Sequence, residues 1–255
     1  MAETPSRRFG RFRGRDPKLP GDRDWERSAL LVPSPAARLP ALVSDGTGLA
    51  FSLGALEAPA TPLDLAEPAV AALLAQLTSE AARRGEYPAS GHDPATVTTP
   101  EQRLEGWREL ARSDEEALFA RGMPPALLTV ALRRQGRRGG AWAAVASSAS
   151  QPLRATRGTI RASTWRLDPA HELRSEDTLL RVLVTEQAFA GGQRADGRVL
   201  APDIFVDENE IVLTMFITPR PGFQSGSRNP ETPVRVELPH AVGARRLRDG
   251  ALARP

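Results

Sequence analysis

The run Ile211-Val212-Leu213-Thr214-Met215-Phe216-Ile217 is almost wholly apolar and has the length of one strand. Strands with one solvated face alternate apolar and polar residues, whereas strands covered on both faces read as continuous apolar runs. Asp207-Glu208-Asn209, just before the run, is typical of a turn. The sequence therefore predicts a central strand from Glu210 to Thr218 that is buried on both faces.

Further strands are predicted on either side of this run. Val234 to Leu238 alternates apolar and charged residues and should be half-exposed. The remaining predicted strands span residues 29–32, 41–43, 48–53, 126–133, 141–148, 154–167, 178–186 and 198–206. The glycine-rich residues 135–140 favour a hairpin connection, since they lack the Lys-Ser/Thr pair of a phosphate-binding loop.

The middle third of the chain shows helical signals. Asp64 and Glu67 resemble a capping box, and Thr99, Pro100 and Gln102 mark a second helix start. Apolar residues with helical spacing follow both starts: Val70, Leu73, Leu74, Leu77 and Ala81 after the first, and Leu104, Trp107, Leu110 and Ala111 after the second. A short continuation is predicted from Ser113 to about Gly122.

These elements predict an α+β fold, mainly an antiparallel β-sheet with a central helical block packed on one face. Residues 1–27 are polar, rich in Arg, Pro and Gly, and are predicted to be a flexible basic arm. Residues 28–250 are predicted to form a single domain, with a helical block at about 64–122 and a β-rich part at about 124–250. Residues 251–255 are predicted to form a tail.

Charge is unevenly distributed along the chain. The formal net charge is +3, but residues 1–18 carry about +4 and residues 245–255 about +3, which leaves the body slightly acidic. Such a body is not a nucleic-acid-binding surface by charge alone. The arm alternates cations with aromatics, and its arginines are candidate contacts to nucleic acid or an acidic membrane: Arg7, Arg8, Arg11, Arg13 and Arg15. A solvated tail is the simpler interpretation.

The chain has no cysteine, which excludes disulfides, thiolate metal sites and a cysteine nucleophile. We find no apolar run near the roughly 20 residues that span a bilayer, and no signal peptide. These features favour a cytoplasmic location.

Candidate catalytic groups are few. The three histidines are His92, His171 and His240, and none lies at metal-ligand spacing from another. A site built from His92, Asp93, His171 and Glu172 is one interpretation, and ordinary surface or turn roles are the other. Four acidic residues gather near one predicted hairpin: Asp203, Asp207, Glu208 and Glu210. They fit a solvated turn better than a calcium loop, whose Asp-x-Asp-x-Asp-Gly pattern is missing. We therefore predict no cofactor and no metal.

Residues 185–233 carry a pattern of their own. It begins Thr185-Glu186-Gln187-Ala188-Phe189-Ala190-Gly191-Gly192 and, after the predicted strand pair, ends Pro221-Gly222-Phe223-Gln224-Ser225-Gly226-Ser227-Arg228-Asn229-Pro230. This pattern resembles a C-terminal module of uncharacterised exported proteins and lipoproteins of actinobacterial type. The resemblance covers roughly residues 178–250. It implies a fold relationship and no activity.

The resemblance implies a cysteine pair that this chain lacks. Phe189 stands where the first cysteine of the module would be, and Gly226 where the second would be. In the exported relatives the pair would tie the 188–192 loop to the 222–233 loop, and losing both cysteines fits a move to the cytosol. We expect the Phe189 ring to be buried against the second loop in place of the disulfide.

Three functions follow as hypotheses. The leading one is a non-enzymatic binding or interaction protein that contacts an unknown protein partner through its β-rich C-terminal half. The second is a hydrolase-type enzyme with a dispersed His/carboxylate site. The third is a binder of anionic surfaces, nucleic acid or acidic lipid, through the N-terminal arm.

Overall fold

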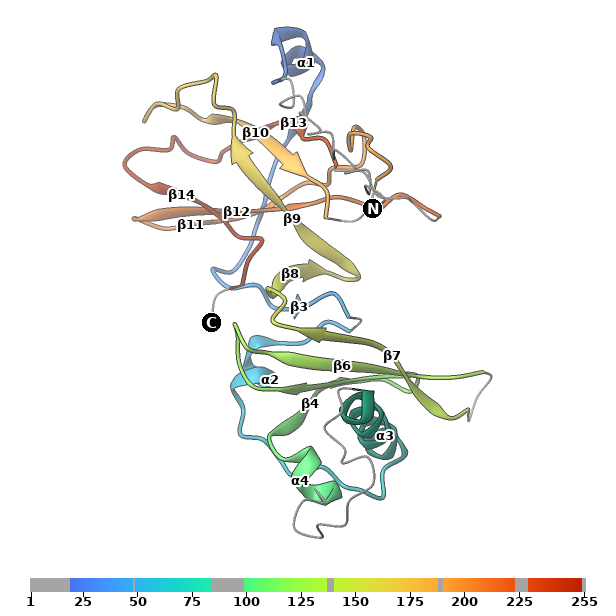
Figure 1. The fold of residues 1–255 in the computed structure, drawn as a ribbon. Coiled ribbons are helices and arrows are strands. Elements are labelled where there is room, and N and C mark those ends of the chain that lie inside the picture. The colour runs from blue at the N-terminus through green and yellow to red at the C-terminus, as the bar shows by residue number, and fades with distance from the viewer. Residues whose placement is uncertain are drawn as a thin grey trace, which may run out of the picture.

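The computed structural model describes residues 19–47, 49–83, 99–136, 140–187, 190–222 and 229–253. Over these residues the protein is mainly β, with fourteen strands, three short helices and one substantial helix. Figure 1 shows two parts, a curled sheet above and a second sheet with α2, α3 and α4 below. The described residues thus form two sheets, where the sequence predicted one sheet with a helical block.

The larger sheet is mixed and has ten strands. Its main path runs β1-β13-β10-β9-β12-β11-β2, with β14 paired to β12, β8 paired to β9, and β3 paired to β8. We call it the large sheet. Its strands are β1 (Ala29–Leu31), β2 (Ser34–Pro35), β3 (Val43–Ser44), β8 (Arg154–Arg157), β9 (Ile160–Leu167), β10 (Leu179–Thr185), β11 (Asp203–Val206), β12 (Glu210–Phe216), β13 (Thr232–Glu237) and β14 (Arg246–Asp249).

The large sheet curls into a half-barrel around the apolar run from Ile211 to Ile217. Leu213 and Met215 of β12 point into the interior, where they join residues such as Val182 of β10 and Val236 of β13. Val212 and Phe216 lie on the opposite face of β12 and are also buried. The prediction of a central strand covered on both faces is confirmed. β13 alternates buried and more exposed positions as predicted.

One short segment of the chain supplies the strands at both ends of the main path of the large sheet. β1 pairs in parallel with β13 at one end, and β2 pairs in parallel with β11 at the other. Two residues, Val32 and Pro33, separate β1 from β2 along the chain. The Ala36 N–H continues the β2 contact by donating to the Ile204 carbonyl oxygen at 2.8 Å. We call residues 19–36 the clasp, because a single stretch of chain spans the two sheet edges.

The clasp begins inside the region predicted to be a flexible arm. Residues Asp22–Arg27 form helix α1, whose Trp25 is buried. The Arg181 guanidinium lies 5.6 Å from the Trp25 ring centroid, and Arg194 pairs with Asp24 at 3.1 Å. Residues 19–27 therefore belong to the folded body, since a buried tryptophan anchors them. Periodicity cannot reveal an anchor made by one aromatic residue.

The smaller sheet has four antiparallel strands in the order β4-β5-β6-β7. We call it the small sheet. Its strands are β4 (Trp107–Arg112), β5 (Glu116–Arg121), β6 (Leu128–Arg134) and β7 (Trp142–Ala149), and the nearby helices are α2 (Leu53–Glu57), α3 (Pro68–Arg83) and α4 (Pro100–Leu104). Helix α3 covers one face through Val70 and Leu73, and α2 covers the other through Leu56. β6 and β7 form the predicted hairpin.

The predicted helical block at 64–122 is wrong beyond α4. The Thr99 capping box and Pro100 do start a helix, but it ends at Leu104, and Trp107 begins a strand. Trp107 packs on the α3 side of the small sheet, whereas Leu110 packs on the α2 side. A bulge at Leu110, between Glu109 and Ala111, adds to the irregular spacing. A strand buried on both faces with a bulge mimics the i, i+3, i+4 spacing of a helix.

Two further predictions are corrected. The strand predicted at 48–53 is reduced to one bridge, between Phe51 and Val43, and helix α2 starts at Leu53 because the Ser52 hydroxyl accepts the Ala55 N–H. Helix α3 begins at Pro68, four residues after the predicted cap Asp64. None of the helices in the described part of the chain is both long and apolar enough for a membrane span.

Candidate functional site

The two histidines that the structure describes, His171 and His240, show no sign of a catalytic or metal site. His171 is half-buried and His240 is exposed. Across the described residues neither side chain takes part in a hydrogen bond or ion pair, and no three His, Asp or Glu side chains gather to hold a metal. His92 and Asp93 lie outside the described residues. The hydrolase hypothesis gains no support from His171, His240 or Glu172, and for His92 it stays a prediction.

The acidic cluster is engaged with arginines and with its own turn. Asp203 pairs with Arg157, and Glu210 pairs with two arginines. The Asp207 carboxylate accepts the backbone N–H groups of Asn209 and Glu210 at 2.8 Å, and these bonds hold the pKa of Asp207 below its ordinary value. Glu208 is exposed. The calcium interpretation is therefore not supported by the geometry.

Residues of the 185–233 pattern form a structural tie. Glu186 is buried and accepts two hydrogen bonds from Arg198, at 2.7 and 2.6 Å. The Asn229 side chain donates to the Glu186 carbonyl oxygen at 2.9 Å and accepts the Ala190 N–H at 3.0 Å. Asn229 thus joins the segment that follows β10 to the segment that precedes β13.

Some sequence predictions fall outside the described residues. These are the burial of Phe189, the place of Gly226, and the anionic contacts of Arg7, Arg8, Arg11, Arg13 and Arg15. They stay predictions, as does binding of nucleic acid or acidic membrane through the arm.

The small sheet ends in an open edge at β7. β7 pairs with β6, and the described residues supply no strand on its other side. Val145, Ser147 and Ala149 are exposed along it. The strand reads Trp-Ala-Ala-Val-Ala-Ser-Ser-Ala from Trp142 to Ala149, with no charge and no proline. Charges and prolines are the devices that usually prevent strand addition at an edge.

The pairing with β6 fixes which backbone groups of β7 face outward. The Gln135 N–H donates to the Ala141 carbonyl oxygen, and the Ser150 N–H donates to the Leu127 carbonyl oxygen, both at 2.8 Å. Hydrogen-bonded and non-hydrogen-bonded pairs alternate in an antiparallel ladder. The alternation can be counted from Ala141 at one end of β7 and from Ser150 at the other. By this count the backbone N–H and C=O groups of Ala144 and Ser147 point away from β6. No described strand pairs with these groups, so they can pair with an added strand.

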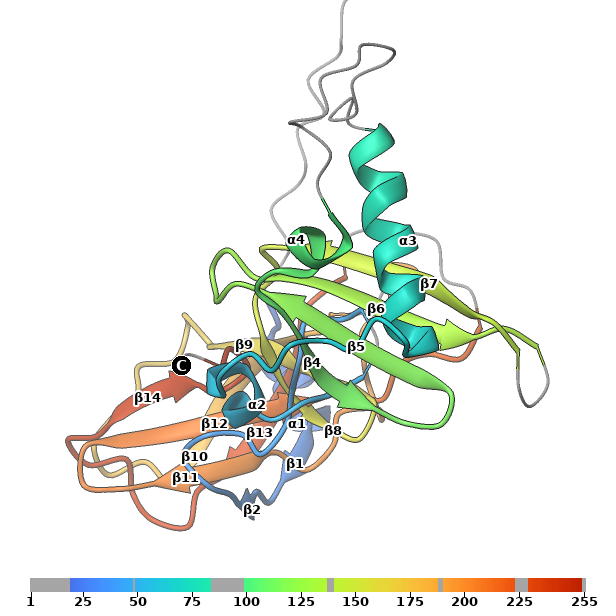
Figure 2. The same ribbon diagram turned by 90° about the horizontal axis from the view of Figure 1, so that it is seen from below.

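A groove adjoins the C-terminal end of this edge. It has a volume of about 560 Å³ and lies between α3, α4 and the strands β5 to β7. Its apolar lining includes Leu77, Trp107 and Leu128, and Ser147 and Ala149 of β7 form part of its wall. Figure 2 looks at this sheet face-on and shows α3 crossing β6 and β7 and extending past β7. A strand added to β7 would run beside the groove and under α3.

The sequence predicted this strand but did not place it at a sheet edge. The available signal was the absence of charge over Trp142 to Ala149, in a chain with 25% charged residues. Sequence alone could not show that this strand lies at a sheet edge.

Comparison with known proteins does not assign this chain to a family. Neither the protein-family models nor the curated proteins nor the solved structures include a match to this chain. The resemblance of residues 185–233 to the actinobacterial module stays a prediction, and functional argument rests on the geometry above.

Proposed function

We propose that the protein is a non-enzymatic interaction protein that binds an extended segment of a protein partner along the free edge of β7. The observation that carries this proposal is the uncharged, exposed edge beside a groove. Edge strands bind peptides through main-chain hydrogen bonds, and neighbouring pockets select side chains. Here the edge supplies the first element and the groove under α3 supplies the second.

The chemistry of the site defines the partner segment. Small Ala and Ser side chains on β7 let another backbone approach closely, and the strand offers no charge for a charged partner to pair with. The groove is lined in part by Leu77, Trp107 and Leu128. We expect a segment that is extended, free of proline and uncharged where it pairs with β7, with one apolar side chain that enters the groove.

A second copy of the chain fits this edge poorly. Antiparallel pairing of two β7 strands through a two-fold axis would put both α3 helices on the same face of a joined sheet. Because α3 packs mainly on β7 and extends past it, each α3 would reach over the edge strand of the other copy, into the space that the other α3 needs. Packed helices need about 8–10 Å between their axes. A single added strand avoids this clash.

The test is selection of binding peptides from a random library displayed on phage. Peptides enriched on the wild-type protein are measured on Ser147→Pro, which removes an outward N–H and leaves the pairing with β6 in place. We expect binding to weaken at least about tenfold, because proline removes a hydrogen bond and blocks the approach of a strand. Ala149→Trp, which fills the groove, should weaken peptides with an apolar anchor.

The matched control is Ser147→Ala, which keeps the backbone N–H and should keep binding. Thermal melting of all three variants checks that the fold is retained. Peptides that bind Ser147→Pro as tightly as wild type would refute the proposal. Enrichment of no peptide, together with a dimer that Ser147→Pro dissociates, would identify a second copy as the occupant instead.

A further inference from the structure

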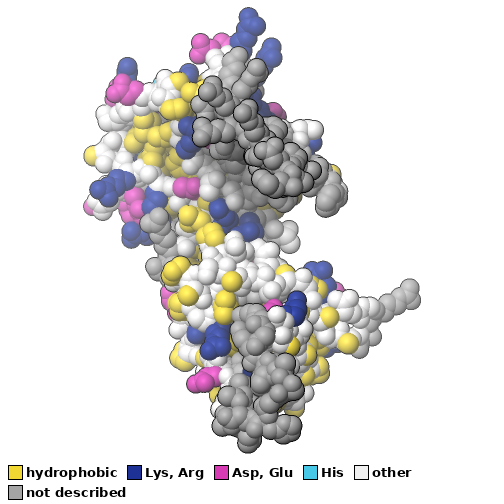
Figure 3. All heavy atoms as spheres, viewed as in Figure 1, with side chains coloured by type: hydrophobic (Ala, Val, Ile, Leu, Met, Phe, Trp, Pro, Cys, Tyr) yellow, Lys and Arg dark blue, Asp and Glu magenta, His cyan; other side chains and the backbone are white. Residues whose placement is uncertain are grey.

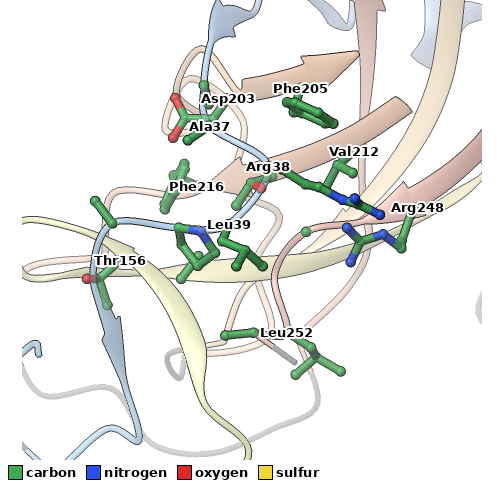
Figure 4. A pocket seen from close by; sticks show the side chains of 17 residues that line it. Ala37, Arg38, Leu39, Thr156, Asp203, Phe205, Val212, Phe216, Arg248 and Leu252 are labelled. Atoms are coloured by element: carbon green, nitrogen blue, oxygen red, sulfur yellow. The ribbon is translucent and has the colours of Figure 1, made fainter. Parts of the chain in front are cut away.

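A second hollow lies on the outer face of the large sheet, away from β7. It is a cavity of about 200 Å³ between residues 36–41, the strands β11, β12 and β14, and residues 250–253 (Figure 4). An apolar cavity of roughly 150 Å³ is enough to hold benzene. This cavity therefore has room for a ligand built on one ring.

The cavity wall is apolar because β12 is buried on both faces. Val212 and Phe216 leave β12 on the side opposite the barrel interior, and Phe205 of β11 lies beside them. Leu39 and Leu252 line the cavity from the two segments that cover it. Gly250 lets the C-terminal segment lie against β12, since a side chain there would collide with Thr214. Its N–H donates to the Leu213 carbonyl oxygen at 3.0 Å.

Two arginines stand together at one end of the cavity. Figure 4 shows the guanidinium groups of Arg38 and Arg248 side by side. Both bind the Glu210 carboxylate, Arg38 through Nε at 3.0 Å and Arg248 through Nε at 3.0 Å and Nη2 at 3.3 Å. Within the part of the chain that the structure describes, both Nη groups of Arg38 and Nη1 of Arg248 have no protein partner. These donors are available to a ligand.

The charges at the cavity match a single negative charge. Two arginines and one glutamate leave a net charge of about +1 at this end, and Asp203 at the cavity wall is already neutralised by Arg157. Glu210 would repel a phosphate dianion placed beside the arginines. A carboxylate accepts two parallel hydrogen bonds from a guanidinium and carries one charge.

We propose that this cavity binds a small aromatic or branched monocarboxylic acid. Its carboxylate pairs with Arg38 and Arg248, and its apolar body packs on Phe205, Val212 and Phe216. The site is separate from the β7 edge, so this inference does not depend on the proposed protein interaction.

The experiment is titration of the ¹⁵N-labelled protein with benzoate, followed by amide chemical shifts. We expect saturable shifts at Leu39, Val212 and Leu252. Benzamide has the same ring and no charge, and should bind at least about tenfold more weakly, as expected for loss of a charge-assisted hydrogen bond. Inorganic phosphate should give no saturable shift at Val212.

The variant Arg38→Gln should weaken benzoate binding about tenfold, while Arg248 still holds Glu210. Arg133→Gln on the small sheet, where Arg133 pairs with Glu116, removes the same charge away from the cavity and should leave binding unchanged. Benzoate that shifts none of the three amides overturns the proposal. So does equal binding of benzoate and benzamide, or saturable phosphate binding as tight as benzoate; these comparisons use the wild-type protein and do not depend on a variant folding.

Discussion

The two sheets differ in the length and the covering of their edge strands. In the large sheet, the end strands β1 and β2 are short and belong to one clasp, which also buries Trp25. In the small sheet, β7 has eight residues with no strand beside it in the described part of the chain. The space-filling view in Figure 3 shows a narrow waist between the two parts. The long, uncovered edge of the small sheet is therefore where we place the proposed partner strand.

The other edge of the small sheet is protected. β4 has a bulge at Leu110 and carries Arg108, Glu109 and Arg112. Arg108 donates to the Leu56 and Ala58 carbonyl oxygens at 2.6 and 2.8 Å, which fixes the 56–58 segment beside β4. Bulges and charges oppose strand addition. β7 also has an irregularity near Val145, yet it has no charge. The two edges of the small sheet therefore differ in two respects: β4 carries charged residues and has the 56–58 segment beside it, and β7 has neither in the described part of the chain.

The strongest test of this comparison removes the anchor of the clasp. Trp25→Ala should lower the free energy of unfolding by about 3 kcal/mol, because it deletes a buried aromatic side chain. Amide hydrogen exchange should rise at Ala29 to Leu31 and at Ser34, while β5 and β6 stay protected. Trp142→Ala, at a half-buried position on the open edge, is the control and should cost less. Equal exchange changes in both sheets would show that the clasp does not act on the large sheet alone.

A smaller effect is expected from the tie between the two loops. Asn229→Ala removes the hydrogen bonds to Ala190 and Glu186 and should cost about 1–2 kcal/mol in urea unfolding. Asn209→Ala, in an exposed turn, should change stability little. If the two variants are equally stable, the tie is dispensable.

The smallest effect concerns pH. Burial raises the pKa of Asp249, although its carboxylate accepts N–H groups from Ala251 and Trp165. A raised folded pKa means that the native state holds the proton more tightly, so stability falls as pH rises above the ordinary value of 3.8. Relative to Asp249→Asn, the wild-type protein should therefore lose stability as pH rises above 3.8.

Asp207 supplies the control of opposite sign. Its pKa is lowered by backbone N–H groups, so its contribution is present above pH 3.8 and is lost as pH falls below that value. Relative to Asp207→Asn, the wild-type protein should lose stability on acidification. Urea unfolding measured above pH 3.8 for Asp249 and below pH 3.8 for Asp207 gives both differences, and slopes of the same sign would contradict these assignments.

The sequence located most strands and failed at β4, a bulged strand with a core on each face. Continuous apolar residues at 211–217 identified β12, and alternation at 234–238 identified β13. At β4 the same logic gave a helix, because Trp107 and Leu110 serve cores on opposite faces of a bulged strand. The sequence was a poorer guide to functional residues than to strands. His171, His240 and the acidic residues 203–210 were visible as residue types, but the positions that make the edge and the cavity carry no distinctive chemistry.

The sequence by itself determined that the chain is mainly β, that β12 is covered on both faces, and that no cysteine chemistry operates. These follow from local period and composition. Tertiary structure alone decided that residues 29–35 span both edges of one sheet, that β7 lies at the edge of the other, and that Arg38 meets Arg248 across 210 positions of the chain. Which strand lies at an edge, and which charges meet, depend on pairings between distant segments, and local periodicity does not encode those pairings.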